Sequence, residues 1–166
     1  MRRMFQSKQG ELKMLYKAIN DELRNAIRNK DNNIKNYTRG IKAKVSEYCV
    51  ANMIEREDPT DDVVLIVIMA HKKSLEKAIE MLGNVERAKD LIEEYNGEIK
   101  FCNKFLPDEK DVIEKVTKII DEIVATNDPN QSGKIIGLVI KSCKEKGFVV
   151  DGALVKKMVI EKLPVK

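Results

Sequence analysis

Apolar residues recur at steps of three and four along most of this chain, and this period limits the fold more than any other feature. The clearest stripe has steps of 4, 3, 4, 3 and 4 through Val64, Ile68, His71, Leu75, Ala78 and Leu82. An α-helix puts such residues on one face, whereas a strand alternates with period two. The β-branched run at 63–69, VVLIVIM, suggests a strand when taken alone, but a strand would not hold this period as far as Leu82. We therefore predict a long helix here and an all-α fold.

Breakers and capping residues between the stripes predict seven helices. We expect the first at about 11–30 and the second from 34 until Glu57-Asp58-Pro59, because a residue before proline is disfavoured in a helix. Gly83 is expected to end the third helix and Gly147 to cap the end of the sixth. The predicted N-caps, whose short polar side chains accept from backbone N–H groups, are Asn33, Thr60, Asn84, Asp108, Ser132 and Asp151.

The sequence Leu106-Pro107-Asp108 marks the clearest domain boundary, because the proline stops one helix and the aspartate can start the next. We predict an N-terminal domain at 1–106, a bundle of about four helices, and a small three-helix domain at 107–166. The first helix of the second domain is strongly amphipathic, and its apolar side carries Val112, Ile113, Val116, Ile119, Ile120, Ile123 and Val124.

Charge is spread unevenly along the 166 residues. Residues 1–44 hold 12 Lys and Arg against 4 Asp and Glu, residues 45–131 hold 11 against 20, and residues 132–166 hold 8 against 3. Two interpretations stay open. The basic ends fold onto the acidic middle and neutralise it, or they form a basic surface for RNA or another polyanion, since phosphate contacts dominate nucleic-acid affinity.

No residues are spaced as a catalytic or metal-binding motif, so we expect no enzyme activity, no metal and no cofactor. Cys49, Cys102 and Cys143 lie far apart at apolar positions, which favours reduced, buried thiols. His71 is the only histidine and lies on an apolar stripe, so we interpret it as a packed residue with a hydrogen-bond partner. Gly133-Lys134 lacks the spacing of a phosphate-binding loop.

We predict structural roles for the glycines in the last thirty-odd residues. Gly133 and Gly137 are four apart on one helix, and two such glycines cost roughly 2 kcal/mol in helix propensity. We expect them to offset that cost by letting another helix approach closely. Asp151-Gly152 is expected to build the turn into the last helix rather than to act in catalysis.

Several motifs together resemble the GatB/YqeY family. Phe105-Leu106-Pro107 is similar to its aromatic-Leu-Pro junction, the segment GKIIGLV at 133–139 to its G-K-x-x-G-x-[VL] pattern, and DGALV at 151–155 to its D-G-x-x-V pattern. Near the N-terminus, NDELRNAIRNKD at 20–31 resembles the opening helix of the family, and HKKSL at 71–75 is a diverged form of a later motif. Because this resemblance extends to the N-terminal part, it favours a stand-alone YqeY protein over a fragment of GatB.

The resemblance implies a partner. In GatB, a subunit of tRNA-dependent amidotransferases, the related tail domain grips the body of tRNA by shape. By this likeness the residues that would face phosphates are Lys134, Lys141, Lys144, Lys146, Lys156 and Lys157. The family label is that of a carbon–nitrogen ligase with glutamine as amido-N-donor, but the kinase-like active site of that enzyme belongs to a separate domain.

We therefore expect a non-catalytic protein that binds tRNA or another structured RNA. The alternatives are a protein–protein adaptor and an accessory of an amidotransferase that contacts its subunits. The opening residues, MRRMFQSKQGE, lack the apolar run of a secretory signal, so we expect a cytoplasmic protein, with organellar import as the weaker alternative.

Overall fold

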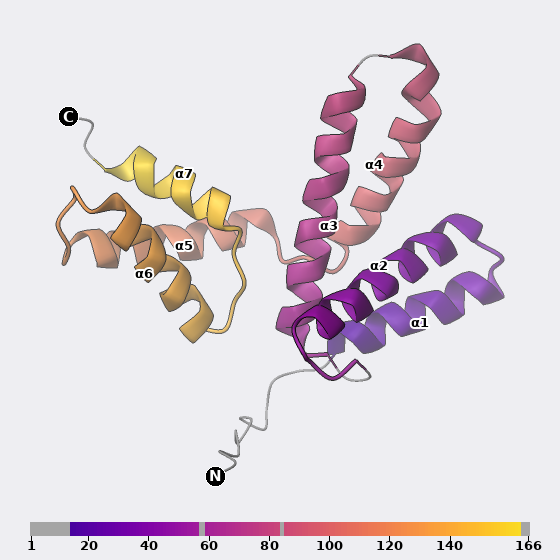
Figure 1. Ribbon diagram of the computed structural model, residues 1–166, viewed down its shortest axis with the longest axis horizontal. Coiled ribbons are helices and arrows are strands. Elements are labelled where there is room, and N and C mark those ends of the chain that lie inside the picture. The colour runs from indigo at the N-terminus through magenta and orange to yellow at the C-terminus, as the bar shows by residue number, and fades with distance from the viewer. Residues whose placement is uncertain (1–13, 57–58, 84, 164–166) are drawn as a thin grey trace, which may run out of the picture. The chain divides into compact units, whose positions relative to one another are not determined.

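The computed structural model describes residues 14–56, 59–83 and 85–163, and in these ranges it contains helices and no strands (Figure 1). The all-α prediction is confirmed. No helix in the described ranges has both the length and the hydropathy that a membrane crossing requires. The elements are α1 (Met14–Arg28), α2 (Asn32–Ala51), α3 (Asp61–Leu82), the short 3₁₀ turn η1 (Glu86–Ala88), α4 (Lys89–Asn103), α5 (Glu109–Val124), α6 (Ser132–Glu145) and α7 (Gly152–Lys162).

The helices fall into two compact units. The N-terminal unit extends as far as Leu106 and contains α1 to α4, and the tail unit begins at Pro107 and contains α5 to α7. Each unit has its own cluster of buried apolar side chains.

The N-terminal unit consists of two helical hairpins, α1–α2 and α3–α4 (Figure 1). Helix α3 packs against α1 and α2, and α4 packs against α3 and α2. Near its start, α1 is tied to α3 by the backbone N–H of Leu15, which donates to Asp61 Oδ1 at 2.9 Å. The core of this unit comprises Ile19, Tyr37, Ile41, Val45, Cys49, Val63, Val64, Val67, Ile68, Phe101 and Cys102.

Helix α3 confirms the choice of helix over strand for the β-branched run. Val64 and Ile68 are fully buried, four residues apart on the face that contacts the core. Thr60 occupies the N-cap position as predicted, but its hydroxyl makes no capping hydrogen bond. Gly83 ends the helix with φ +55°, a conformation that is strained for residues with a Cβ.

Helix α2 differs from the prediction at both ends. Its N-cap is Asp31, whose carboxylate accepts from Ile34 N at 3.0 Å, and the predicted Asn33 is already helical. The helix ends at Ala51, well before Pro59, because the next residues satisfy its last carbonyls: the Asn52 side chain donates to Tyr48 O at 2.8 Å. The expected extension of the first helix to 11–13, the breaker at Glu57-Asp58 and the cap at Asn84 lie outside the described residues.

Helix α4 contains a glycine that its neighbours require. A Cβ built on Gly97 would lie 2.8 Å from Tyr37 Oη, closer than real Cβ contacts. That hydroxyl donates to Glu94 O at 3.3 Å, so it is held in place. Next along the helix, the Phe101 ring lies 6.1 Å from the Tyr37 ring and 5.3 Å from the Phe105 ring. Gly97 therefore lets α2 and α4 approach each other at an aromatic cluster.

The tail unit is a three-helix arrangement around an aliphatic core. Its fully or almost fully buried residues are Val116, Ile119, Ile120, Ile135, Val139, Cys143, Val155 and Val159. Asp108 and Asp151 are the N-caps of α5 and α7, and their carboxylates accept from Lys110 N at 2.8 Å and from Ala153 N at 2.9 Å. These two capping predictions are confirmed.

Two predicted caps of α6 are wrong by one residue. Gln131 is the N-cap, and Ser132 is the first helical residue. At the other end Lys146 is the C-cap, and Gly147 follows it with φ +81°. A glycine in this left-handed position just beyond the cap is the usual way to reverse the chain, and Phe148 N then donates to Cys143 O at 3.1 Å.

Candidate nucleic-acid interface

Three of the predicted RNA-contacting lysines share the outer side of α6. Lys134, Lys141 and Lys144 are exposed and seven and three residues apart, so they follow one side of the helix. The opposite side is occupied by the buried residues Ile135, Val139 and Cys143, which explains why the lysines face solvent. Lys156 and Lys157 are exposed on the neighbouring helix α7, which packs against α6.

Three of the six predicted lysines are engaged by carboxylates. Lys141 Nζ lies 3.8 Å from Glu145, and Lys157 Nζ lies 4.0 Å from Glu161, each one turn along its own helix. Lys146 turns instead toward α5, where its Nζ lies 3.3 Å from Glu122 Oε2. Within the described residues, no ion pair is made by Lys134, Lys144 or Lys156. The structure thus divides the predicted set into three free and three paired cations.

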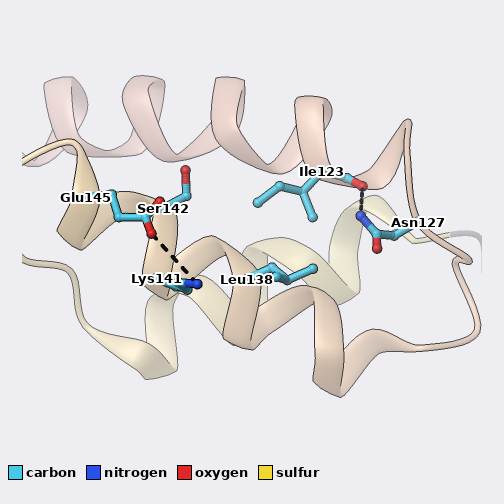
Figure 2. Close-up of a pocket in the computed structure, with 6 residues that line it drawn as sticks. All are labelled: Ile123, Asn127, Leu138, Lys141, Ser142 and Glu145. Atoms are coloured by element: carbon cyan, nitrogen blue, oxygen red, sulfur yellow. Dashed lines mark hydrogen bonds and ion pairs between the residues drawn. The ribbon is translucent and has the colours of Figure 1, made fainter.

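A shallow hollow of about 290 Å³ lies between α5 and α6 beside Lys141 (Figure 2). Its lining residues are Ile123, Asn127, Leu138, Lys141, Ser142 and Glu145. Figure 2 shows Lys141 and Glu145 side by side on α6, while the Asn127 side chain donates back to the Ile123 carbonyl at 2.9 Å. The exposed ammonium and the Ser142 hydroxyl can donate hydrogen bonds to an anion.

A second hollow, of about 400 Å³, lies where α5 meets the turn after α6. Its lining includes the lysines Lys115, Lys118 and Lys146, together with Ile119, Glu122, Gly147 and Phe148. Glu114 accepts from Lys118 Nζ at 2.8 Å, which raises the pKa of that exposed lysine. Sequence reasoning missed Lys115 and Lys118 because α5 is mostly acidic. The signal was the turn at Gly147, which brings Lys146 back to α5.

Lys162 has a similar role to Lys146. Its Nζ donates to Asp121 Oδ1, which joins α7 to α5. Asp121 is adjacent in sequence to Glu122, the partner of Lys146. Residues 107–166 as a whole hold 11 Lys and Arg against 10 Asp and Glu. The basic excess of the last helices is therefore largely offset within their own domain by the acidic helix α5.

The predicted structural residues have mixed outcomes. Gly152 lies against α6, where a built Cβ would be 3.7 Å from Ile140 Cδ1. The expected close approach of a helix at Gly133 and Gly137 is wrong: both are exposed, and no described atom lies within 4 Å of a Cβ built there. They lie away from the core because Ile135 and Val139 take the buried side of α6. Pro107 is exposed at the start of the tail unit.

His71 is held as predicted. Its Nε2 lies 2.7 Å from Glu98 Oε1, and the two side chains are 9% and 15% exposed. The pair joins α3 to α4 in the N-terminal unit. Sequence reasoning could not name the partner, because Glu98 is 27 residues away.

The cysteines are buried and free, as expected. Burial, and then the charge of Glu98, raises the pKa of the Cys102 thiol to about 12, and burial also raises the pKa of Cys143. Both thiols are therefore protonated and poor nucleophiles near neutral pH. No group of three or more metal-ligating side chains occurs among the described residues.

Comparison with known proteins agrees with the motifs of the sequence. No curated protein matches the chain. A family model described as "Yqey-like protein" matches residues 16–163, which include helices from both units. This match extends over far more than half of the chain, and the chain therefore belongs to the YqeY-like family.

Proposed function

We propose that this protein binds tRNA or another structured RNA through the lysines of its tail unit and catalyses no reaction. The observation that carries the proposal is that Lys134, Lys144 and Lys156 are exposed and make no ion pair within the described residues. Membership of the YqeY-like family supports it through the resemblance to GatB, which implies a tail domain that grips tRNA.

The chemistry of this surface suits contacts to the RNA backbone. An ammonium group binds phosphate as a point charge and carries no base information, so a lysine surface positions an RNA without reading its sequence. Folded RNA is recognised largely in this way, through its shape and its phosphates. The near absence of aromatic residues from the tail unit, where Phe148 is the single one, agrees with a role that does not require base stacking.

The paired lysines would join the free ones at small cost. The pairs of Lys141 with Glu145 and of Lys157 with Glu161 are exposed and about 4 Å long. Exposed pairs of this kind contribute on the order of 0.2–0.5 kcal/mol, so a phosphate can replace the carboxylate. Lys146 is different, because its partner Glu122 lies on another helix and the pair also fastens α6 to α5.

The experiment is a titration of unmodified tRNA with the full chain at 50 and 200 mM salt, followed by gel shift. The variant K134E/K144E/K156E is expected to weaken binding at least tenfold at 50 mM. A plot of the logarithm of the association constant against the logarithm of the salt concentration should also become less steep, with its slope smaller by about 2 to 3. Each lost phosphate contact removes about 0.7–0.9 from that slope.

A matched control carries the same change in charge at the other unit. K77E/K89E/K100E reverses three exposed lysines of α3 and α4 and is expected to bind almost as the natural protein does. If both triple variants weaken binding equally, net charge alone explains the result and the tail surface is not the site. No binding by the natural protein at 50 mM salt would end the proposal.

A protein–protein adaptor, including an accessory of an amidotransferase, is the second candidate. One observation favours it: Met81, Val85 and Leu91 are 88%, 49% and 38% exposed around the turn between α3 and α4. Large apolar residues gathered at a hairpin end suit a protein partner better than a phosphate. Light scattering after size exclusion, and pull-down with amidotransferase subunits, would test it. Loss of a complex in M81K/L91K would support this role, and a monomer that captures no subunit would contradict it.

A further inference from the structure

A second group of basic residues lies in the N-terminal unit, on the two helices of the α1–α2 hairpin. On α1, Lys17, Arg24 and Arg28 are seven and four residues apart, so they follow one side of the helix. All three are exposed, whereas Ile19 and Ala26 on the opposite side are buried.

Helix α2 carries a matching row. Lys35, Arg39 and Lys42 are four and three residues apart, so they follow one edge of α2. Arg39 is exposed, whereas Lys35 and Lys42 are half-buried, because the buried Thr38 lies three or four residues from each of them. Lys42 Nζ lies 5.9 Å from the centre of the Tyr16 ring, a residue of α1. This contact places Lys42 beside α1. The hairpin rows, as we name the six residues, are Lys17, Arg24, Arg28, Lys35, Arg39 and Lys42.

The hairpin rows are less neutralised than the tail lysines. Within the described residues, Arg24 alone of the six makes an ion pair, with Asp21 at 3.3 Å, and both side chains are well exposed. Lys35 donates to the neutral Asn32 side chain at 2.6 Å, and Lys42 faces an aromatic ring. By contrast, half of the predicted tail lysines have carboxylate partners. Residues 1–44, which include both rows, hold 12 basic against 4 acidic residues.

The spacing of these cations has a cost that an anion would offset. Arg24 and Arg28 are like charges at i and i+4, and so are Lys35 and Arg39, and such pairs destabilise a helix. Lys17 and Arg28 are eleven residues apart along α1, or on the order of 16 Å, and adjacent helix axes lie about 8–10 Å apart. Cations spaced over these distances can contact several phosphates of one RNA.

We infer that the hairpin rows form a second RNA-contacting surface, which binds the phosphate backbone independently of the tail lysines. The inference rests on the proposed function in one respect, namely that the ligand is RNA. A membrane surface fits less well, because helices that lie on membranes bury a continuous apolar side. Here Ile27 is exposed near one end of the hairpin and Met14 and Val50 near the other, so no apolar stripe follows the rows.

The experiment repeats the tRNA titration with two hairpin variants of the full chain. K35E/R39E/K42E and, separately, K17E/R24E/R28E are each expected to weaken binding at least tenfold at 50 mM salt and to lower the salt slope by about 2 to 3. The second variant leaves the contact of Lys42 with Tyr16 in place, so a folding defect of the first cannot explain both results. Circular dichroism checks the helix content of each, and K77E/K89E/K100E is the charge control.

The outcomes separate this inference from the proposed tail site. If only K134E/K144E/K156E weakens binding, the proposed function stands and the hairpin surface is refuted. If the hairpin variants weaken binding and the tail variant does not, the hairpin surface stands and the tail site falls. Failure of the natural protein to bind tRNA overturns both. Sedimentation with phosphatidylserine vesicles tests the membrane, and hairpin-dependent binding to vesicles without binding to tRNA would also overturn the inference.

Discussion

The interiors of the two units are built differently. The tail unit buries aliphatic side chains and one cysteine, with no aromatic residue among its fully buried ones. The N-terminal unit buries an aromatic cluster and holds polar groups within it: Tyr37 Oη bonds to Glu94 O, Thr38 Oγ1 to Ile34 O, and His71 to Glu98. The stability of an aliphatic core depends mainly on how completely its volume is filled. The stability of a buried polar pair depends on whether both partners are present and on their protonation states. The two units should therefore respond to different perturbations.

The tyrosines provide a means to follow one unit alone. All four tyrosines lie in the N-terminal unit, and the chain has no tryptophan. Tyrosine fluorescence therefore reports unfolding of that unit, while far-ultraviolet circular dichroism reports both. The predictions below use this difference.

The largest effect is expected from Ile120→Ala in the tail unit. Ile120 is fully buried, and truncating such a side chain costs about 2–5 kcal/mol, a large fraction for a domain of roughly 60 residues. Urea unfolding should show the circular dichroism transition moving to lower urea while the tyrosine transition stays. Ile160→Ala, at a site 51% exposed, is the control and should change stability by less than about 0.5 kcal/mol. An equal shift of the tyrosine transition would show that the units unfold as one.

A smaller effect, of about 1–3 kcal/mol, is expected from Gly97→Ala in the N-terminal unit. The new methyl group would meet Tyr37 Oη at 2.8 Å, and overpacking outweighs the gain of about 1 kcal/mol in helix propensity. The tyrosine transition should move to lower urea. Gly137→Ala has open space around the added Cβ, so it should stabilise the tail unit by up to about 1 kcal/mol. If both substitutions stabilise, the contact at Gly97 does not restrict α4.

The smallest effect concerns alkaline pH. Because the pKa of Cys102 is raised from 9.0 to about 12 on folding, this thiol contributes stability that is present below about pH 9 and lost as pH rises toward 12. Between pH 8 and 9.5 the N-terminal unit should lose about 1 kcal/mol or less, measured by tyrosine fluorescence in urea. Cys102→Ala should flatten this loss, and Cys143→Ala in the tail unit should not. Equal losses in the natural protein and in Cys102→Ala would contradict the assignment.

Periodicity and caps predicted most of the fold because both are local. The stripe from Val64 to Leu82 needed only neighbouring residues to indicate α3, and the carboxylates of Asp108 and Asp151 cap helices that begin one residue later. The end of α2 was mispredicted because proline was given more weight than the capping contacts after Ala51.

The candidate site was less predictable because its properties depend on contacts between helices. That Lys146 would be held by Glu122, 24 residues away, is not encoded in local spacing. The glycines of α6 were interpreted as packing residues because their spacing matches a helix contact, but that pattern does not tell which side of α6 is buried. In the sequence the hairpin rows are visible only as a charge excess of residues 1–44, and it is the contact with Tyr16 that places Lys42 beside α1.

The hydrogen bond from Leu15 to Asp61 bears on the order in which the N-terminal unit can fold. The first N–H groups of a helix have no partner within it, and for Leu15 the acceptor arrives from 46 residues later. A chain leaving the ribosome cannot complete the start of α1 until the beginning of α3 has been synthesised. The contact must also offset the entropy of closing a loop of that length. We therefore expect the start of α1 to gain amide-exchange protection only after α3 has docked.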